Sequence, residues 1–392
     1  MEKLKYTRVE ECCEILDSMR IPITASDRKE GKYPYYGANG IQDYVNDYIF
    51  DDELVLLAED GGNFGSKEKP IAYRVSGKCW VNNHAHVLKP KEEIDVDYLC
   101  YSLMFYKVDG MINGATRKKL TQTAMKKMKI PLRNIVEQKK IVQQLNKIIE
   151  IREKAKKELN LLDNLIQARF IEVFGNPESN SKGWKECSLS EKLNVLGGYA
   201  FKSDQFDENI GIPVLRIGNI NAGYFKPVNM VYWKEDSKLA KYTLYPGDLV
   251  MSLTGTVGKD DYGNVCILGN DYEMYYLNQR NAKLEIKKDI NKYYLSQLLR
   301  FKQIKKKLTG ISRGVRQANI SNKDILNLVI PIPPMELQEQ FAAFVQQVNK
   351  SKFVIHKFLY CTTHNTKSII KPRPNTKESG KIRGGKPHAD EF

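Results

Sequence analysis

The sequence predicts an α+β protein in which two copies of one small α/β module are joined by two long helices that pair as an antiparallel coiled coil. Three observations lead to this prediction. Two halves of the chain match each other at an offset near 200 residues, short apolar runs alternate with glycine- and asparagine-rich turns, and a long apolar seam with helical spacing follows each half. At 392 residues, the chain is long enough for two or three domains.

The internal repeat is clearest near the end of each copy. Residues 114–132 resemble residues 314–332, and Pro131 aligns with Pro331 at an offset of 200 residues. Earlier blocks match in the same order at offsets of 195 or 196 residues, namely 80–90 with 276–286 and 53–65 with 248–258. Matching blocks in matching order indicate a duplication, and the fold must be interpreted accordingly.

Each copy has the pattern of a small α+β domain. Short strands are indicated by apolar runs between turn residues, at 54–58, 86–88, 212–217 and 248–253. The segments 35–40 and 61–65 are rich in glycine and predict turns with positive φ angles. The tracts 97–106 and 291–304 have the spacing of helices with one apolar face.

A change of pattern after Pro131 predicts a helix from about 135 to 174, which would span about 60 Å. Its apolar residues recur at spacings of three and four, or sums of these, as in coiled coils; they are Ile141, Leu145, Ile148, Leu159, Leu162 and Ile166. A second helix beyond Pro334 carries Phe341, Phe344, Val345 and Val348. Such seams need a partner. Pairing within one chain is favoured over a homodimeric coiled coil, because both helices are present in each chain.

These elements divide the chain into five segments. The two modules are 1–132 and 179–333, and the two helical spacers are 133–178 and 334–362. The remaining segment, 363–392, is rich in Pro, Gly and Lys towards its end and is expected to be a disordered basic tail.

The charge of the chain favours a polyanionic partner. Its formal net charge is +15, and cations that neutralise phosphates release condensed counterions. The alternative is a basic protein with an ordinary solvated surface. No apolar run is long enough to span a membrane, and the N-terminus lacks the apolar stretch of a signal peptide. The seven cysteines form no CxxC pair, which favours reduced thiols and a cytoplasmic location.

Motifs for catalysis are missing from the sequence. It has no GxxxxGK[ST], HExxH or GxSxG pattern, and NPES at 176–179 only partly resembles the NPPF-type tetrapeptide of amino-methyltransferases. His84 and His86 lie two residues apart, as metal ligands could, but no third ligand is nearby in the sequence. We therefore expect no catalytic residue, no metal and no cofactor bound by this chain. Strand histidines or polar groups facing a nucleic acid are the preferred interpretation.

Binding chemistry remains. Basic, glycine-containing loops let a backbone approach phosphates while cations neutralise them; the candidates are Arg117, Lys118, Lys119, Arg313, Arg316 and Gln317. Amide and basic side chains at repeated or glycine-rich positions could read base edges or cap turns; they are Tyr36, Asn39, Asn83, His84, Arg216, Asn219, Gln279 and Arg280. The run Lys305–Lys307 is interpreted as a solvated helix face.

The arrangement resembles the specificity (S) subunit of type I restriction–modification enzymes. The resemblance covers about residues 1–360 and rests on ordered motifs at 211–220, 247–259, 277–284, 330–341 with a weaker copy at 130–141, and 169–177. Two departures are the replacement of IPIPP by IPLRN in the first copy and the atypical tail.

The resemblance implies two target recognition domains, each reading half of a split site in double-stranded DNA. The long helices would set the gap between the half-sites and dock two methyltransferase (M) subunits. Those subunits would bind S-adenosylmethionine and flip out an adenine for methylation, and restriction (R) subunits would use ATP and Mg²⁺. Alternatives are a stand-alone DNA-binding protein, a basic coiled-coil scaffold and a fused nuclease–methyltransferase, the last disfavoured by the missing motifs.

Overall fold

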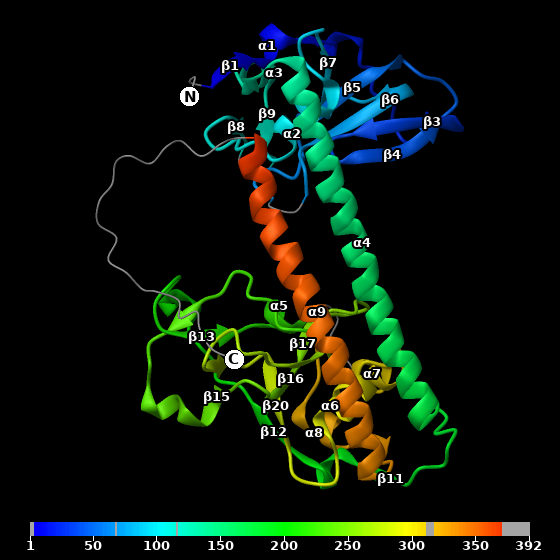
Figure 1. Ribbon diagram of the computed structural model, residues 1–392, viewed down its shortest axis with the longest axis vertical. Helices are drawn as coiled ribbons and strands as arrows, with labels where there is room; N and C mark the ends of the chain where they lie inside the picture. The colour runs from blue at the N-terminus through cyan, green and yellow to red at the C-terminus, as the bar shows by residue number, and fades with distance from the viewer. Residues whose placement is uncertain (1–3, 67–68, 115–116, 311–316, 371–392) are drawn as a thin grey trace. The chain divides into compact units, whose positions relative to one another are not determined.

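The computed structural model describes residues 4–66, 69–114, 117–310 and 317–370 (Figure 1). These residues form two compact units. The first contains the residues up to Lys156 and those from Lys357 onward, and the second is Lys157–His356. Helices α4 (Ile135–Phe174) and α9 (Met335–Ile370) each have one part in either unit. We call residues 4–132 the first module and residues 179–333 the second module.

The first module is built on one six-stranded sheet. Its strands lie in the order β2 (Cys13–Ile15), β7 (Ala85–Pro90), β5 (Phe50–Ala58), β6 (Ala72–Val81), β3 (Glu30–Gly37) and β4 (Gly40–Val45). The second half of strand β5, residues 54–58, is apolar without alternation because both its faces are covered. Val55 and Leu57 pack with Tyr98 and Leu99 of helix α2 (Val96–Met104), and Leu54 belongs to a cluster on the opposite face.

The second module divides the corresponding strands between two four-stranded sheets. One has the order β12 (Leu193–Gly197), β20 (Asn281–Ile286), β16 (Leu249–Ser252) and β18 (Val265–Ile267). The other has the order β14 (Tyr232–Trp233), β13 (Ile212–Leu215), β19 (Tyr275–Leu277) and β15 (Thr243–Leu244).

Shorter elements complete both modules. Those of the first are β1 (Lys5–Arg8), α1 (Val9–Cys12), η1 (Asp17–Met19), β8 (Ile112–Asn113), β9 (Lys119–Leu120), α3 (Gln122–Lys126) and β10 (Lys129–Leu132). Those of the second are β11 (Glu186–Ser188), η2 (Leu189–Glu191), η3 (Ser203–Gln205), α5 (Ile217–Ile220), η4 (Ser237–Tyr242), β17 (Thr254–Thr256), α6 (Lys292–Leu298), α7 (Lys302–Thr309), β21 (Gln317–Asn319), α8 (Asn322–Leu326) and β22 (Val329–Pro331).

The duplication predicted from the sequence is confirmed by paired contacts at the end of each module. The Tyr98 hydroxyl donates to the Pro131 carbonyl at 2.9 Å, and the Tyr294 hydroxyl donates to the Pro331 carbonyl at 2.8 Å. At the start of each long helix a fully buried glutamine, Gln138 or Gln338, accepts a hydrogen bond of 2.8 Å from the backbone of the N-cap residue of α2 or α6. The change from IPIPP to IPLRN therefore leaves this junction intact.

Helices α4 and α9 pair within one chain and run antiparallel. In the second unit, Phe170 of α4 meets Phe341 of α9 with ring centroids 5.5 Å apart. Nearer the start of the α4 part, Asp163 accepts a 2.5 Å bond from Lys352, which is later in α9. Residue numbers thus rise along one helix as they fall along the other. Helix α9 continues to Ile370, beyond the end expected at 362; the expected tail from 371 to 392 lies outside the described residues.

One expectation about the surface is wrong. Lys305 is not part of a solvated helix face, because it is buried and its ammonium donates to Asp260 and, at 2.7 Å, to Asn264. In the sequence, Lys305 could not be distinguished from its charged neighbours Lys306 and Lys307. Among the described helices, none is both long and apolar enough to cross a bilayer.

Candidate nucleic-acid interface

Parallel strand pairs bring the predicted contact residues together in both modules. In the first module β3 runs parallel to β6, with Tyr35 opposite Trp80. In the second module β13 runs parallel to β19, with Val214 opposite Tyr276. Parallel neighbours end at the same edge of a sheet, so the segments that follow them converge. These segments are 36–39 with 82–84 in the first module and 216–219 with 278–280 in the second.

In the first module, three predicted residues gather around the turn at Asp60 and Gly61. Asp60 forms ion pairs of 2.7 Å with His84 and 2.8 Å with Arg117. The Asn39 side chain donates to the Gly61 carbonyl at 3.0 Å. Lys119 is paired in the same region, 3.0 Å from Glu59. We call Glu59 and Asp60 the acidic pair; it holds the predicted phosphate-binding cations in place while their side chains stay largely exposed.

A buried ion network lies beneath the acidic pair. His86 is fully buried, with Nδ1 2.7 Å from an Asp17 carboxylate oxygen and Nε2 2.9 Å from the Leu120 carbonyl. The Leu120 carbonyl can only accept a hydrogen bond, so Nε2 donates to it, and Nδ1 faces the Asp17 carboxylate. Although burial opposes it, the hydrogen bond from His86 holds the pKa of Asp17 below its usual value. Arg20 completes the network by donating to Glu59 at 2.7 Å.

The network around His86 bears on whether the histidine pair could bind a metal ion. Asp17, Glu59 and His86 are ligand types whose atoms lie close together. Their oxygen atoms, however, already bind Arg20, His86 and Lys119, so the geometry is that of an internal salt-bridge cluster rather than of a cation site. His84 is partly exposed at the predicted interface, whereas His86 faces the interior. Of the two interpretations of the histidine pair, His86 fits that of a strand histidine, because it is buried in strand β7.

In the second module the predicted residues line a cleft of about 590 Å³. Arg216, Asn219, Gln279 and Arg280 all contribute to its wall, and we call it the second-module cleft. Sequence reasoning missed three further lining residues, Lys226, Phe201 and Phe206. Among the described residues that line the cleft there are three cations and no carboxylate. The aromatic residues in YAFKSDQF at 199–206 were the available sequence signal.

The lining residues of the second-module cleft differ in how tightly they are held. Asn219 is buried: its side-chain oxygen accepts from the Arg216 backbone at 2.9 Å and its nitrogen donates to the Lys226 carbonyl at 3.1 Å. It shapes the wall of the cleft and does not present its amide to a ligand. Gln279 and Arg280 are exposed, so their side chains are available to a ligand.

The other predicted contact residues occupy varied positions. Tyr36 is half-buried beside Tyr73, at a ring-centroid distance of 5.7 Å, while Asn83 and Lys118 are exposed. Arg313 and Arg316 lie outside the described residues, and Gln317 begins strand β21, with its side chain also outside the description.

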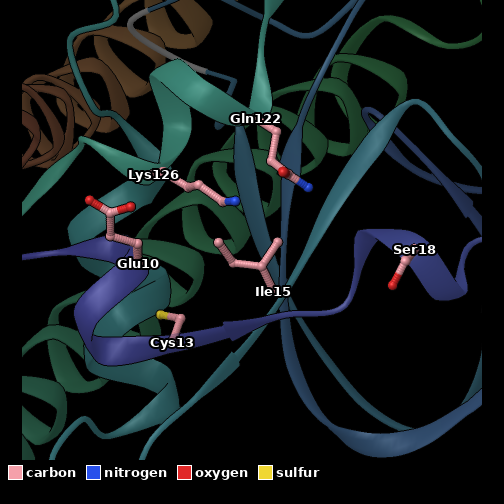
Figure 2. A pocket seen from close by; sticks show the side chains of 6 residues that line it. All are labelled: Glu10, Cys13, Ile15, Ser18, Gln122 and Lys126. Carbon is pink, nitrogen blue, oxygen red and sulfur yellow. The ribbon is translucent and has the colours of Figure 1, made fainter.

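A second hollow, of about 470 Å³, lies in the first module (Figure 2). Its lining comes from α1, β2, η1 and α3, and consists of Glu10, Cys13, Ile15, Ser18, Gln122 and Lys126. It contains none of the predicted contact residues, and we assign it no role.

The helical seam residues are mostly turned inward. Leu145, Leu159, Ile166, Phe341, Val345 and Val348 are buried, and Ile141, Ile148, Leu162 and Phe344 are partly buried. They hold the helices to each other and to the modules, and a docking partner would meet other residues. In the second unit, the exposed apolar residues of the two helices include Leu161 and Leu165 of α4 and Phe353 and Val354 of α9. We call these four residues the exposed apolar set.

Comparisons with known proteins agree with this geometry. The chain matches the family described as type I restriction modification DNA specificity domain over residues 1–161 and 181–359. It is 27% identical to a putative type I restriction enzyme specificity subunit of Haemophilus influenzae, covering 88% of this chain and 87% of that protein. It is 26% identical to the MjaVIII specificity subunit of Methanocaldococcus jannaschii, covering 89% and 86% of the two chains.

Among solved structures, the S subunit of a type I restriction–modification system from M. genitalium has a similar fold. The TM-score is 0.55 at 14% identity, with 95% of this chain and 96% of that chain covered. The family match spans well over half of the sequence and includes both modules. The chain therefore belongs to the family of specificity subunits of type I restriction–modification systems.

Proposed function

We propose that this chain reads a bipartite site in double-stranded DNA, one half-site with each module, and that it docks M and R subunits that carry out the chemistry. The observation that carries the proposal is the second-module cleft, which collects four residues predicted from sequence to contact DNA. The equivalent strand ends of the first module collect Asn39, His84 and Arg117. The chain itself is non-catalytic, and S-adenosylmethionine, ATP and Mg²⁺ belong to the partner subunits.

The chemistry of the second-module cleft suits a base edge with its adjoining backbone. An arginine can donate two hydrogen bonds to guanine, and a glutamine can pair in the same way with adenine. Arg280 and Gln279 are exposed, adjacent in sequence and suited to these roles. Lys226 provides a cation for a phosphate, and Phe201 provides apolar contact for a sugar or a thymine methyl group.

The exposed apolar set supports docking along the long helices. Leu161 is 65% exposed and Val354 is 65% exposed, while the seam residues of the same two helices are buried or partly buried. Apolar side chains left in water on a helix indicate an interaction surface. We assign this surface to the M subunits.

Methylation mapping tests the proposed function. The chain would be co-expressed with the M subunit encoded in its native host, and methyladenine would be mapped on a plasmid library of random sequence. We expect the two proteins to purify together and to methylate a split motif. Arg280→Ala should relax the motif in one half only. A chain that purifies alone and still methylates or cuts DNA would contradict the proposal.

A further inference from the structure

One wall of the second-module cleft is a single loop. Residues 217–229, which begin with helix α5, supply Lys226 and Asn229 to the lining; we call this segment the cleft loop. Its inner side is closed by a 2.7 Å hydrogen bond from the Lys226 backbone to the Asn219 carbonyl. The Arg216 guanidinium also donates to the Asn229 carbonyl. The shape of the cleft therefore depends on where this loop lies.

The tip of the cleft loop is attached to residues outside the cleft. The Gly223 carbonyl accepts a hydrogen bond from the Arg300 guanidinium. Gly223 has a φ of 76°, so the turn that presents this carbonyl favours glycine. Next to it, the ring of Tyr224 lies 4.2 Å from the ring of His356 in helix α9, measured between centroids. The cleft loop thus contacts a spacer helix directly.

Arg300 is linked to the helix pair through its neighbour Phe301, whose ring centroid lies 4.9 Å from that of Phe170 in helix α4. Burial lowers the pKa of Arg300, and the Asp163 carboxylate of helix α4 opposes that shift. Asp163 in turn binds Lys352 of helix α9 at 2.5 Å. Burial and the Lys352 ammonium lower the pKa of His356, which favours a neutral ring for stacking on Tyr224. Both attachments of the cleft loop therefore lead to the paired helices, one through the segment that contains Arg300 and Phe301 and one through His356.

The first module lacks an equivalent loop among its described residues. There, the segment after the matching strand is a tight turn, in which Gly37 of β3 pairs with Gly40 of β4. In the second module, residues 216–231 separate β13 from β14, a segment of 16 residues that contains the cleft loop. The attachment to the helices is a property of the second module, so the duplication alone does not account for it.

We propose that Arg300 and His356 are positioning residues for DNA reading: they fasten the cleft loop to the paired helices, so that the helices set the shape of the second-module cleft. The role assigned to the cleft rests on the proposed function above. Neither residue is a DNA contact in this proposal. Their substitution should change which bases are accepted while leaving general affinity for DNA nearly intact.

The attachment itself is tested without DNA, by hydrogen exchange in the full chain. Arg300→Gln removes the guanidinium, and Tyr224→Ala removes the ring contact at a partly exposed site where folding is not at risk. In both variants the backbone amides of the cleft loop should exchange hydrogen about fivefold to tenfold faster. This factor is at the lower end of the range that is typical of energetic coupling between two sites. Tyr245→Ala, at an exposed tyrosine of the same module, is the matched control and should leave the loop unchanged. Unchanged exchange in both variants would overturn the proposal.

The consequence for reading is tested with the M-subunit complex. The ratio of affinities for DNA with an intact and a substituted second half-site should fall about fivefold to tenfold in both variants. Arg300→Lys, which keeps a cationic donor, should recover most of the ratio. Faster exchange with an unchanged ratio would overturn the positioning role. If the unsubstituted complex shows no preference for any split site, the proposed function fails, and the exchange result still decides whether the attachment exists.

Discussion

The two modules are duplicated but hold their candidate contact residues in opposite ways. In the first module the cations Arg117 and Lys119 are paired with the acidic pair, which itself covers a buried network of further charges. In the second module the cations Arg216, Lys226 and Arg280 surround a cleft whose described lining has no carboxylate. In the first module the cations lie beside carboxylates, whereas the described lining of the second-module cleft places no carboxylate beside its cations.

This difference has a physical consequence for binding. A phosphate that approaches Arg117 must compete with Asp60 for the guanidinium. The net attraction between Arg117 and the phosphate is therefore weaker than for an unpaired arginine. A phosphate at the second-module cleft meets no such competitor among the lining residues. We therefore expect the second module to dominate the affinity for DNA, and the first module to contribute mainly geometry and selectivity.

The largest expected effect concerns stability of the first module. Asp17→Ala would leave the buried His86 ring and the Arg20 guanidinium without their carboxylate partner, and removing one member of a buried ion pair costs about 3–5 kcal/mol of unfolding free energy. Denaturant unfolding of the full chain would measure the loss, with Asp43→Ala, at an exposed ion pair to Arg28, as the control. A loss no larger than in the control would contradict the network.

The same network predicts the direction of a pH effect. The folded pKa of Asp17 lies below its usual value, so its contribution is complete above the ordinary aspartate pKa of about 3.9 and is lost as pH falls through the folded value. Acid should therefore destabilise the unsubstituted chain more steeply than Asp17→Asn. Denaturant unfolding of both proteins at stepwise lower pH should show that their free energies of unfolding converge. A constant difference between the two proteins at every pH would refute the prediction.

The next effect concerns the cleft. Arg280→Ala should cost about 1–3 kcal/mol of discrimination at one position of the second half-site, because a base edge loses its donor. Competition binding with DNA substituted at single positions would measure it. Arg169→Ala, on the exposed surface of helix α4, is a matched control. An equal loss on every DNA sequence would assign Arg280 to the backbone instead of the bases.

Much of the fold was visible in the sequence because it is carried by local patterns. Helix α4 begins at Ile135 and ends at Phe174, as its apolar spacing and Gly175 predict. The equivalence of the 36–39 and 216–219 segments was missed, although a proline precedes the paired strand residue in each copy: Pro34 before Tyr35 and Pro213 before Val214. A match of so few residues can be recognised only when the strand pairing shows that the two segments occupy equivalent positions.

The candidate sites were less predictable because their roles depend on distant partners. Nothing near His86 in the sequence indicates that its two ring nitrogens contact Asp17 and Leu120. Asn219 and Gln279 have similar side chains, yet one is buried as a structural amide and the other is exposed at the cleft. Residue type and spacing identified these segments as candidates, whereas long-range contacts decide which of their side chains are exposed.

The smallest effect tests the comparison between modules directly. Replacing Arg117, Lys118 and Lys119 with Ala should lower the salt slope of DNA binding by less than the roughly 0.9 per contact of a fully available cation, since Asp60 and Glu59 already neutralise two of them. The reciprocal change, Asp60→Asn, should release Arg117 and steepen the slope. Titrations at several salt concentrations would measure both slopes. If Asp60→Asn leaves the slope unchanged, Arg117 does not reach phosphate, and the first module reads DNA without it.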